Sequence, residues 1–329
     1  MRFSLLSVHD HYPNEQRTVR EHYRETIENI VLAEELGFES FWVAEHHFHE
    51  YGTIPNPAVF LSAASQNTDK IGLGVAISVL PFRNPLHVAE DYLMLDNLSG
   101  GRLLLGVGSG YLRHEFAGFG LDQNKKRDHF DENLVILKKA LSGAKISFEG
   151  TYNSIDSVGI NVPPTNSGGI PIYIAALKKE VAYYIGNKGH SMLSIPYATV
   201  DSLDELRSVV AEYKRGWKER KTDFPPPPIN FAFHAYVAET DAAARAGGEG
   251  PFDYYVKTRL YGKSSGWEEV CKRGYCVFGG IETCISRLNQ MKAIGIEHVS
   301  LLMDFGYMGK EKTQQSMRLM AEQIIPNLD

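Results

Sequence analysis

The chain contains 329 residues, 43% of them hydrophobic and 22% charged, and its formal net charge is −6. This composition is that of a globular protein with a large core, and the negative charge offers no general attraction to nucleic acid or to an anionic membrane surface. The apolar runs are too short to span a bilayer, and His9 and Asp10 follow the first run too early for a signal peptide. We expect a cytoplasmic protein with no nucleic-acid or membrane partner.

Short apolar runs alternate with amphipathic helical stretches along the whole chain. Tyr23, Ile27 and Ile30 follow helical spacing, whereas the run 71–80 is nearly all apolar, as in a strand buried on both faces. The predicted strands comprise residues 3–8, 40–44, 71–80, 102–106, 172–176, 191–195, 229–237 and 298–303. The predicted helices comprise residues 20–36, 57–64, 85–98, 128–142, 178–188, 203–219, 281–294 and 313–325.

Eight strands that alternate with helices favour parallel pairing through right-handed crossovers. A doubly wound open sheet is the structural alternative. Repeats that cover the whole chain, with a helix after the last strand, favour closure into a barrel. We therefore predict the α/β class and a (β/α)8 TIM barrel, formed by a single domain over residues 1–329, with insertions after strands four and seven.

The two predicted insertions interrupt the alternation of strands and helices. Residues 145–169 are too long for a plain connection, and residues 146–152 within them are typical of a small hairpin. Residues 247–274 include four aromatic side chains between Phe252 and Tyr261. We expect this second insertion to be a mobile loop over the barrel mouth, in which residues 252–261 act as a lid.

The three cysteines, Cys271, Cys276 and Cys284, lie close together late in the chain. An odd number of cysteines does not make a disulfide framework, and no Cys-x-x-Cys pair suggests a zinc site. We therefore expect all three to be reduced structural thiols.

The active site of such a barrel lies at the carboxyl ends of its strands. His9 and His11 follow the first strand, and Asp304 follows the last. This arrangement is typical of metal-dependent barrel hydrolases, which hold zinc with imidazole and carboxylate ligands. That design also needs histidines after strands five and six, where this chain has Leu177 and Pro196 instead. A hydrolase that uses His9 and His11 stays an alternative.

Six segments carry a more specific signal when they are taken together in chain order. They are Phe41–Phe48, Gly72–Pro81, Glu90–Asp96, Gly106–Gly110, Glu115–Phe116 and Gln315–Arg318. In this order they resemble the bacterial luciferase-like flavin-dependent monooxygenase family, and the resemblance is densest before residue 142. It implies the same barrel and a flavin site at the barrel mouth.

The resemblance assigns a catalytic role to His46. In the family, the histidine at this position handles protons during the oxygen chemistry of the flavin, and an imidazole is suited to this because it titrates near neutral pH. We expect the next residue, His47, to point the opposite way along the strand and to be structural. Glu45 stays open between orienting one of the histidines and bracing the barrel.

The resemblance also implies cofactor contacts at Ala76, Ile77, Gly108 and Ser109. Ala76 and Ile77 match the position where the family carries a non-prolyl cis peptide beneath the flavin ring, and a small residue there lets the backbone approach that ring. The spaced glycines around Gly108 do not follow the dinucleotide-binding fingerprint. In this context they allow the backbone and Ser109 to contact the flavin side chain or phosphate.

The phosphate of the flavin is expected after the fifth strand, where the N-terminus of a helix offers backbone amides to an anion. The family commonly has small hydroxyl residues there, whereas this chain has Ala176, Leu177 and Lys178. Their amides remain available, Lys178 adds positive charge, and Arg127 serves as a second cation. These residues complete the predicted cofactor site, which contains no metal.

We predict an oxidoreductase, a monooxygenase that uses reduced FMN and O2 to insert one oxygen atom into a small organic substrate. The reduced FMN is supplied by a separate flavin reductase or formed in place, and the resemblance implies a homodimer. The alternatives are a deazaflavin-dependent hydride-transfer enzyme on the same barrel, a flavin-binding protein without turnover, and the hydrolase. Trp42, Tyr111 and Phe305 near strand ends indicate a largely apolar pocket.

Overall fold

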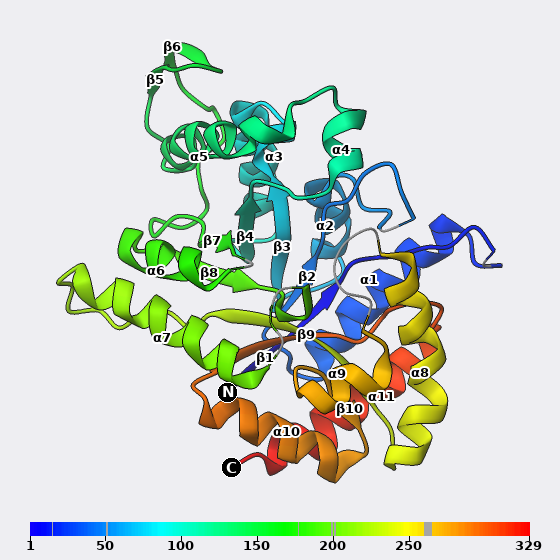
Figure 1. Ribbon diagram of the computed structural model, residues 1–329. Helices are drawn as coiled ribbons and strands as arrows, with labels where there is room; N and C mark the ends of the chain where they lie inside the picture. The colour runs from blue at the N-terminus through cyan, green and yellow to red at the C-terminus, as the bar shows by residue number, and fades with distance from the viewer. Residues whose placement is uncertain (15, 51, 177, 199, 201, 260–264) are drawn as a thin grey trace.

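Among the residues that the structure describes, eight parallel strands close into a barrel surrounded by helices (Figure 1). The structure, a computed structural model, describes residues 1–14, 16–50, 52–176, 178–198, 200, 202–259 and 265–329. Around the ring, the strands are β1 (Arg2–Ser7), β2 (Ser40–Val43), β3 (Gly72–Val79), β4 (Leu103–Gly108), β7 (Ile172–Ala175), β8 (Ser191–Ser194), β9 (Asn230–Val237) and β11 (His298–Leu302). β9 pairs with both β8 and β11, which closes the ring and confirms the predicted TIM barrel.

Several helices begin where the sequence supplies a cap. The Thr18 side chain accepts a hydrogen bond from the backbone N–H of Glu21, and the Glu21 side chain accepts one from the backbone N–H of Thr18. α2 (Pro57–Ser65) and α3 (Pro85–Leu98) each begin with an asparagine cap and a proline at the first helical position. Helices around the barrel include α1 (Val19–Glu35), α2 (Pro57–Ser65), α3 (Pro85–Leu98), α5 (Lys126–Leu141), α6 (Lys179–Lys188), α7 (Leu203–Glu219), α10 (Ile281–Ala293) and α11 (Lys310–Leu319). Within the described ranges, no helix is both long enough and apolar enough to span a bilayer.

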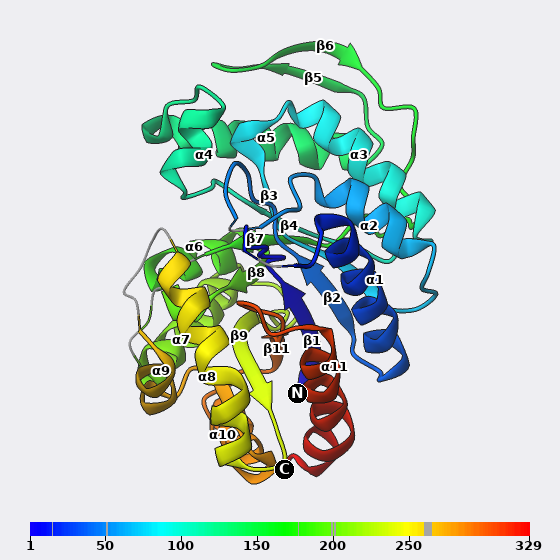
Figure 2. The same cartoon turned by 90° about the vertical axis from the view of Figure 1, so that its right-hand side faces the viewer.

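The first insertion follows β4 and extends outward from the barrel. It comes after α5 and contains an antiparallel hairpin of β5 (Ile146–Glu149) and β6 (Ser154–Val158), whereas the short helix α4 (Arg113–Gly118) lies earlier, between β4 and α5. The hairpin lies at the outer edge of the molecule, beyond α5 and away from the ring of strands (Figure 1, Figure 2). The Glu132 side chain of α5 holds its turn by accepting hydrogen bonds from backbone N–H groups of residues 151–153. The predicted hairpin is therefore confirmed.

The second insertion, after β9, is largely helical where it is described, so the prediction that it is a loop was wrong there. α8 (Asp241–Thr258) covers the first half of the predicted loop, and α9 (Trp267–Arg273) follows. A short strand, β10 (Val277–Gly279), then pairs with the end of β9. Of the predicted lid, residues 252–258 belong to α8, whereas residues 260 and 261 lie outside the described residues.

Tight packing explains why α8 forms despite its glycines and its internal proline. The glycines let the helix approach its neighbours, because a Cβ atom at Gly248 would lie 2.6 Å from the Tyr236 ring. Phe252 and Tyr255 are buried among other aromatic rings, including that of Phe305. Burial of each such ring contributes about 1.5–3 kcal/mol, which exceeds the helix-propensity cost of about 1 kcal/mol for a glycine.

Candidate active site at the barrel mouth

A cavity of about 380 Å³ opens at the carboxyl ends of the barrel strands, and its size is that of a small-molecule site. Apolar side chains from several strands form its walls, among them Val8, Ala44 and Leu302. The following predicted site residues line it: His46, Ala76, Ile77, Gly108, Ser109, Arg127, Ala176 and Lys178. Leu177, which was also predicted, lies outside the described residues. The structure thus brings the described site residues to one cavity.

Strand β3 is irregular where it passes the cavity. The peptide bond between Ala76 and Ile77 is cis, as the resemblance implied, and the register between β3 and β4 shifts between Val75 and Ser78. β4 fits against this irregular segment because the glycine at position 108 has no side chain. A Cβ atom there would lie 2.2 Å from Cδ1 of Ile77. The glycine spacing of β4 therefore serves close packing against β3.

His46 is buried beside Glu115, a residue to which the sequence assigned no role. The Nδ1 atom of His46 lies 3.2 Å from Oε1 of Glu115, and that oxygen also accepts a hydrogen bond from the backbone N–H of His47 at 3.0 Å. Glu115 lies in α4 and is 2% exposed. A carboxylate accepts hydrogen bonds and does not donate them, which places the proton of this contact on Nδ1 of His46. Both side chains line the cavity.

His47 packs among aromatic rings and has a carboxylate of its own. Its Nε2 atom lies 3.1 Å from Oε1 of Glu45, and its ring stands edge-on to the rings of Phe82 and Phe119. Of the two histidines, Glu45 therefore orients His47, which answers the question that the sequence left open. The tandem histidines are held by separate carboxylates and face different surroundings.

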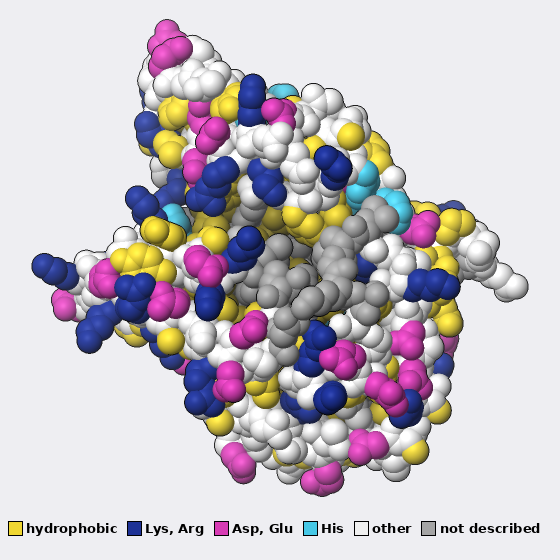
Figure 3. All heavy atoms as spheres, in the orientation of Figure 1, with side chains coloured by type: hydrophobic (Ala, Val, Ile, Leu, Met, Phe, Trp, Pro, Cys, Tyr) yellow, Lys and Arg dark blue, Asp and Glu magenta, His cyan; other side chains and the backbone are white. Residues whose placement is uncertain are grey.

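One side of the cavity is positively charged. Lys126, Arg127 and Lys178 line it at the starts of α5 and α6, and Figure 3 shows Lys and Arg side chains gathered over these two helices. The Nζ atom of Lys126 donates a hydrogen bond to the carbonyl oxygen of Gly110 at 3.0 Å, and burial lowers the pKa of Lys126 below its ordinary value. Lys178 is the N-cap residue of α6, and among the described side chains none caps that end. The Arg127 side chain is 63% exposed and pairs with Asp131 at 2.9 Å. It is therefore less available to a ligand in the cavity than Lys126.

The family described as luciferase-like monooxygenase matches residues 1–298. The chain belongs to this family. It is 30% identical to protein y4wF of Sinorhizobium fredii over 59% of this chain but only 57% of that protein. It is 25% identical to the oxygenase component of the flavin-dependent trigonelline monooxygenase of Acinetobacter baylyi, over 99% of this chain and 95% of that one. It is also 30% identical to an F420-dependent glucose-6-phosphate dehydrogenase of Amycolatopsis mediterranei, over 52% of this chain and 53% of that protein.

Solved structures share the whole barrel of this luciferase-like chain. Monooxygenase RslO1 from Streptomyces bottropensis has a TM-score of 0.92 and 25% identity, with 99% of each chain covered. The oxygenating constituent of 3,6-diketocamphane monooxygenase from Pseudomonas putida, solved in complex with FMN, has a TM-score of 0.84 and 20% identity, over 100% and 99% of the two chains. The second likeness is one of fold alone.

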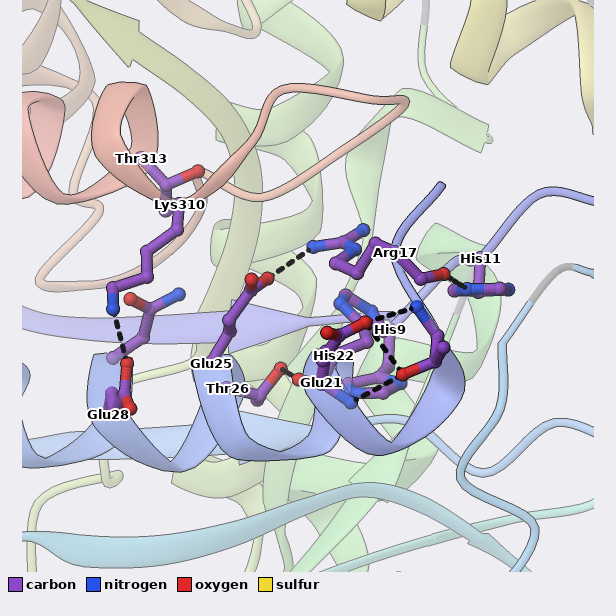
Figure 4. A network of polar contacts seen from close by, with 12 residues as sticks. His9, His11, Arg17, Glu21, His22, Glu25, Thr26, Glu28, Lys310 and Thr313 are labelled. Carbon is purple, nitrogen blue, oxygen red and sulfur yellow. Dashed lines mark hydrogen bonds and ion pairs between the residues drawn. The ribbon is translucent and has the colours of Figure 1, made fainter. Parts of the chain in front are cut away.

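His9 and His11, the ligands of the hydrolase alternative, lie beside α1 (Figure 4). The ring centroids of His9 and His22 are 3.7 Å apart, and Nδ1 of His9 lies 2.7 Å from Oγ1 of Thr53. Nε2 of His11 lies 2.6 Å from the carbonyl oxygen of Arg17. Burial lowers the pKa of His9 to about 3. In the part of the chain that is described, no group of three or more His, Cys, Asp or Glu side chains is placed to hold a metal ion. The family match argues against the hydrolase.

Aromatic side chains enclose the cavity, but they are not all the predicted ones. Tyr111 lines it as expected, together with Tyr197 and Tyr255. Burial raises the pKa of Tyr197 to about 12, so its phenol keeps its proton at neutral pH. Trp42 and Phe305 are fully buried in the core and do not belong to the lining. Trp42 packs against Tyr173, and Phe305 packs against Phe252 and Tyr255 of α8, so the expectation that these two residues line the pocket was wrong.

Among the polar residues that line the cavity, the sequence assigned no role to Glu115, Lys126, Tyr197 and Tyr255. Signals existed for the first two, because Glu115 lies in one of the family segments and Lys126 precedes the predicted Arg127. Tyr197 comes from the turn after β8, and Tyr255 comes from α8. Neither belongs to a local pattern, so only the closed barrel identifies them.

Proposed function

We propose that the protein is a monooxygenase that uses reduced FMN and O2 to insert one oxygen atom into a small organic substrate. The observation that carries this proposal is one cavity in which a buried histidine–carboxylate pair, apolar strand walls and a positively charged side meet. Apolar walls suit a planar ring system, and cations at a helix N-terminus suit a phosphate. The residues present therefore fit FMN. Family membership and the relatives named as monooxygenases support an oxidoreductase.

The chain itself supplies binding, orientation and proton handling. When bound, reduced FMN supplies the electrons and activates O2. His46 holds and transfers a proton at Nε2, while Glu115 keeps the other ring nitrogen protonated. Ala76 and Ile77 hold the ring and exclude water from it. Lys126 and the N-terminus of α6 bind the phosphate.

Incorporation of labelled oxygen into a product tests the proposed reaction. The purified protein is mixed with reduced FMN, isotopically labelled O2 and a panel of organic substrates. We expect one labelled oxygen atom in a product, formed only when protein and substrate are both present. Oxidation of the reduced FMN with reduction of O2 to hydrogen peroxide, and no labelled product from any substrate of the panel, contradicts a monooxygenase.

The F420-dependent relative favours a second candidate, hydride transfer with a deazaflavin on the same barrel. Both cofactors have a ring system that suits apolar walls and an anionic tail that suits cations. The cavity alone therefore does not show which of the two cofactors binds. Binding of F420 in preference to FMN, followed by oxidation or reduction of a substrate without O2, would replace the first proposal with this one.

The positively charged side of the cavity is expected to select FMN over riboflavin. In Lys126→Met, the Kd for FMN is expected to rise by about 10- to 100-fold, because a charged hydrogen bond contributes about 1.5–3 kcal/mol. The Kd for riboflavin, which lacks the phosphate, is expected to stay within a factor of about two of that of the unmodified protein. Quenching of flavin fluorescence measures both constants.

Lys138→Met is the matched control, because Lys138 is an exposed lysine in the last turn of the same helix. It is expected to change neither constant. If Lys126→Met weakens the binding of FMN and of riboflavin equally, this lysine contacts the ring or stabilises α5 instead of binding the phosphate.

We propose further that the protein forms a homodimer through α2 and α3. Val59 on α2 and Met94 and Leu98 on α3 are 69%, 53% and 50% exposed, and exposed apolar patches mark interaction sites. Met94→Lys is expected to convert the dimer to a monomer in light scattering. Val135→Lys, at an apolar residue of α5 that is 47% exposed, is expected to leave the dimer intact. An unchanged mass of Met94→Lys contradicts this interface.

A further inference from the structure

Two of the three cysteines lie side by side, away from the candidate active site. The Sγ atoms of Cys271 and Cys276 are 3.9 Å apart, and the thiol of Cys276 donates toward Cys271. All three cysteines are free, and Cys276 is buried whereas Cys271 is partly exposed. A partly exposed thiol in contact with a second one is the arrangement of a reactive pair, not that of isolated structural thiols.

A short turn brings the two thiols together. Cys271 lies in the last turn of α9, and Cys276 directly precedes β10. The chain reverses at Gly274, whose φ of 84° lies in the left-handed region that favours glycine. The absence of a side chain there also admits Arg287, since a Cβ atom at Gly274 would lie 2.1 Å from Nη1 of that arginine. Bonding of the sulfurs requires them to approach from 3.9 Å to about 2.05 Å.

The surroundings make the two thiols unequal. The hydrogen bond from Cys276 lowers the pKa of Cys271, with further lowering by Arg287 and Arg245, while burial and Asp241 oppose it. Arg287 is fixed at this place because its Nη2 group donates a hydrogen bond to the carbonyl oxygen of Cys271 at 3.2 Å. Burial raises the pKa of Cys276. Cys271 is thus the thiol of the pair that loses its proton more easily, and Cys276 is the one that keeps it.

We propose that Cys271 and Cys276 form a reversible redox-modification site that takes hydrogen peroxide as its oxidant. The Cys271 thiolate attacks one peroxide oxygen and breaks the O–O bond, which gives a sulfenic acid and hydroxide. The Cys276 sulfur then attacks the sulfenic sulfur and displaces its hydroxyl group, which leaves as water with the thiol proton. Overall, the two thiols lose two electrons and one peroxide is reduced to water.

The disulfide would tie α9 to β10, and packed side chains connect both elements to the cavity. The ring of Trp267, at the start of α9, stacks on that of Phe278 in β10 with the centroids 4.1 Å apart. The backbone N–H of Trp267 donates a hydrogen bond to Asp253 of α8 at 2.9 Å. α8 also carries Tyr255, which lines the cavity. The thiol pair therefore lies next to the elements that form one wall of the cavity.

Mass spectrometry of peptides from the oxidised full-length protein tests the proposal. The protein is treated with hydrogen peroxide, alkylated with iodoacetamide under denaturing conditions, digested and measured. We expect the peptides of Cys271 and Cys276 to be linked, to have lost two hydrogens and to resist alkylation until dithiothreitol is added. Cys284 is expected to be alkylated throughout. A sulfinic acid on Cys271 with Cys276 still alkylated, or a disulfide between two molecules, would overturn the proposal.

Two variants show whether oxidation of Cys271 depends on Cys276 or is the general reactivity of a thiol. In Cys276→Ala, peroxide is expected to carry Cys271 to sulfinic acid, and alkylation of the native protein at Cys271 is expected to slow several-fold at neutral pH, because its hydrogen-bond donor is gone. Cys284→Ala is the control and is expected to form the disulfide as the unmodified protein does. Alkylation of Cys271 at the same rate with and without Cys276 contradicts the proposal that Cys276 lowers the pKa of Cys271.

Discussion

Replacing His46 with alanine is expected to lower kcat by about 10²- to 10⁴-fold while FMN still binds. The imidazole lies in the cavity with Nδ1 held 3.2 Å from Glu115, so the variant loses the nitrogen that exchanges the proton. The proposed phosphate contacts come from Lys126 and the N-terminus of α6 and remain in place. Product formation from reduced FMN and O2 measures turnover, and quenching of flavin fluorescence measures binding.

His47→Ala is the matched control for this experiment. His47 is the neighbouring histidine, and its side chain contacts Glu45. Its backbone N–H, which bonds to Glu115, is retained in the variant. We expect kcat to change by no more than a few-fold. A similar loss of kcat in both variants, or the loss of FMN binding in His46→Ala, contradicts the proton-handling role of His46.

Glu115→Gln is expected to lower kcat by about 10- to 100-fold with little change in KM, because the carboxylate positions His46 and does not bind substrate. Glutamine keeps the size of the side chain but replaces one carboxylate oxygen with an amide group that can only donate a hydrogen bond. Since Glu115 is 2% exposed, solvent does not replace the contact that Nδ1 of His46 loses. Steady-state kinetics measure kcat and KM separately.

Glu45→Gln makes the same substitution at the carboxylate of the other histidine. Because Glu45 contacts His47, kcat is expected to stay within a few-fold of that of the unmodified protein. Thermal unfolding followed by circular dichroism shows whether either variant loses stability. A raised KM at unchanged kcat in Glu115→Gln would assign that residue to substrate binding instead of to the positioning of His46.

Local patterns in the sequence were sufficient for the barrel. Runs such as 71–80 and 229–237 carry their own strand signal, because a strand buried on both faces is apolar throughout. The asparagine caps Asn56 and Asn84, each followed by a proline, mark the starts of α2 and α3 in the same local way. Family segments added His46 and the Ala76–Ile77 peptide bond, which the structure places at one cavity.

The helical second insertion shows where local patterns fail. Glycines and Pro251 favour a loop when each is considered alone. The helix forms because its aromatic face is buried against β9, β10 and the barrel rim, as the positions of Phe252 and Tyr255 show. That gain depends on residues far away in the chain, so tertiary packing overrides the local preference.

The amino-acid sequence by itself determined the order of the eight barrel strands and of the helices that alternate with them, and it identified one histidine of the site. Only the tertiary structure decided which groups act with that histidine. Glu115 lies 69 residues from His46 in the chain, and closure of the ring brings the ends of β2 and β4 to the same mouth. Contacts of this kind follow from the three-dimensional path of the backbone and leave no local pattern, whereas each strand and helix is encoded in its own residues.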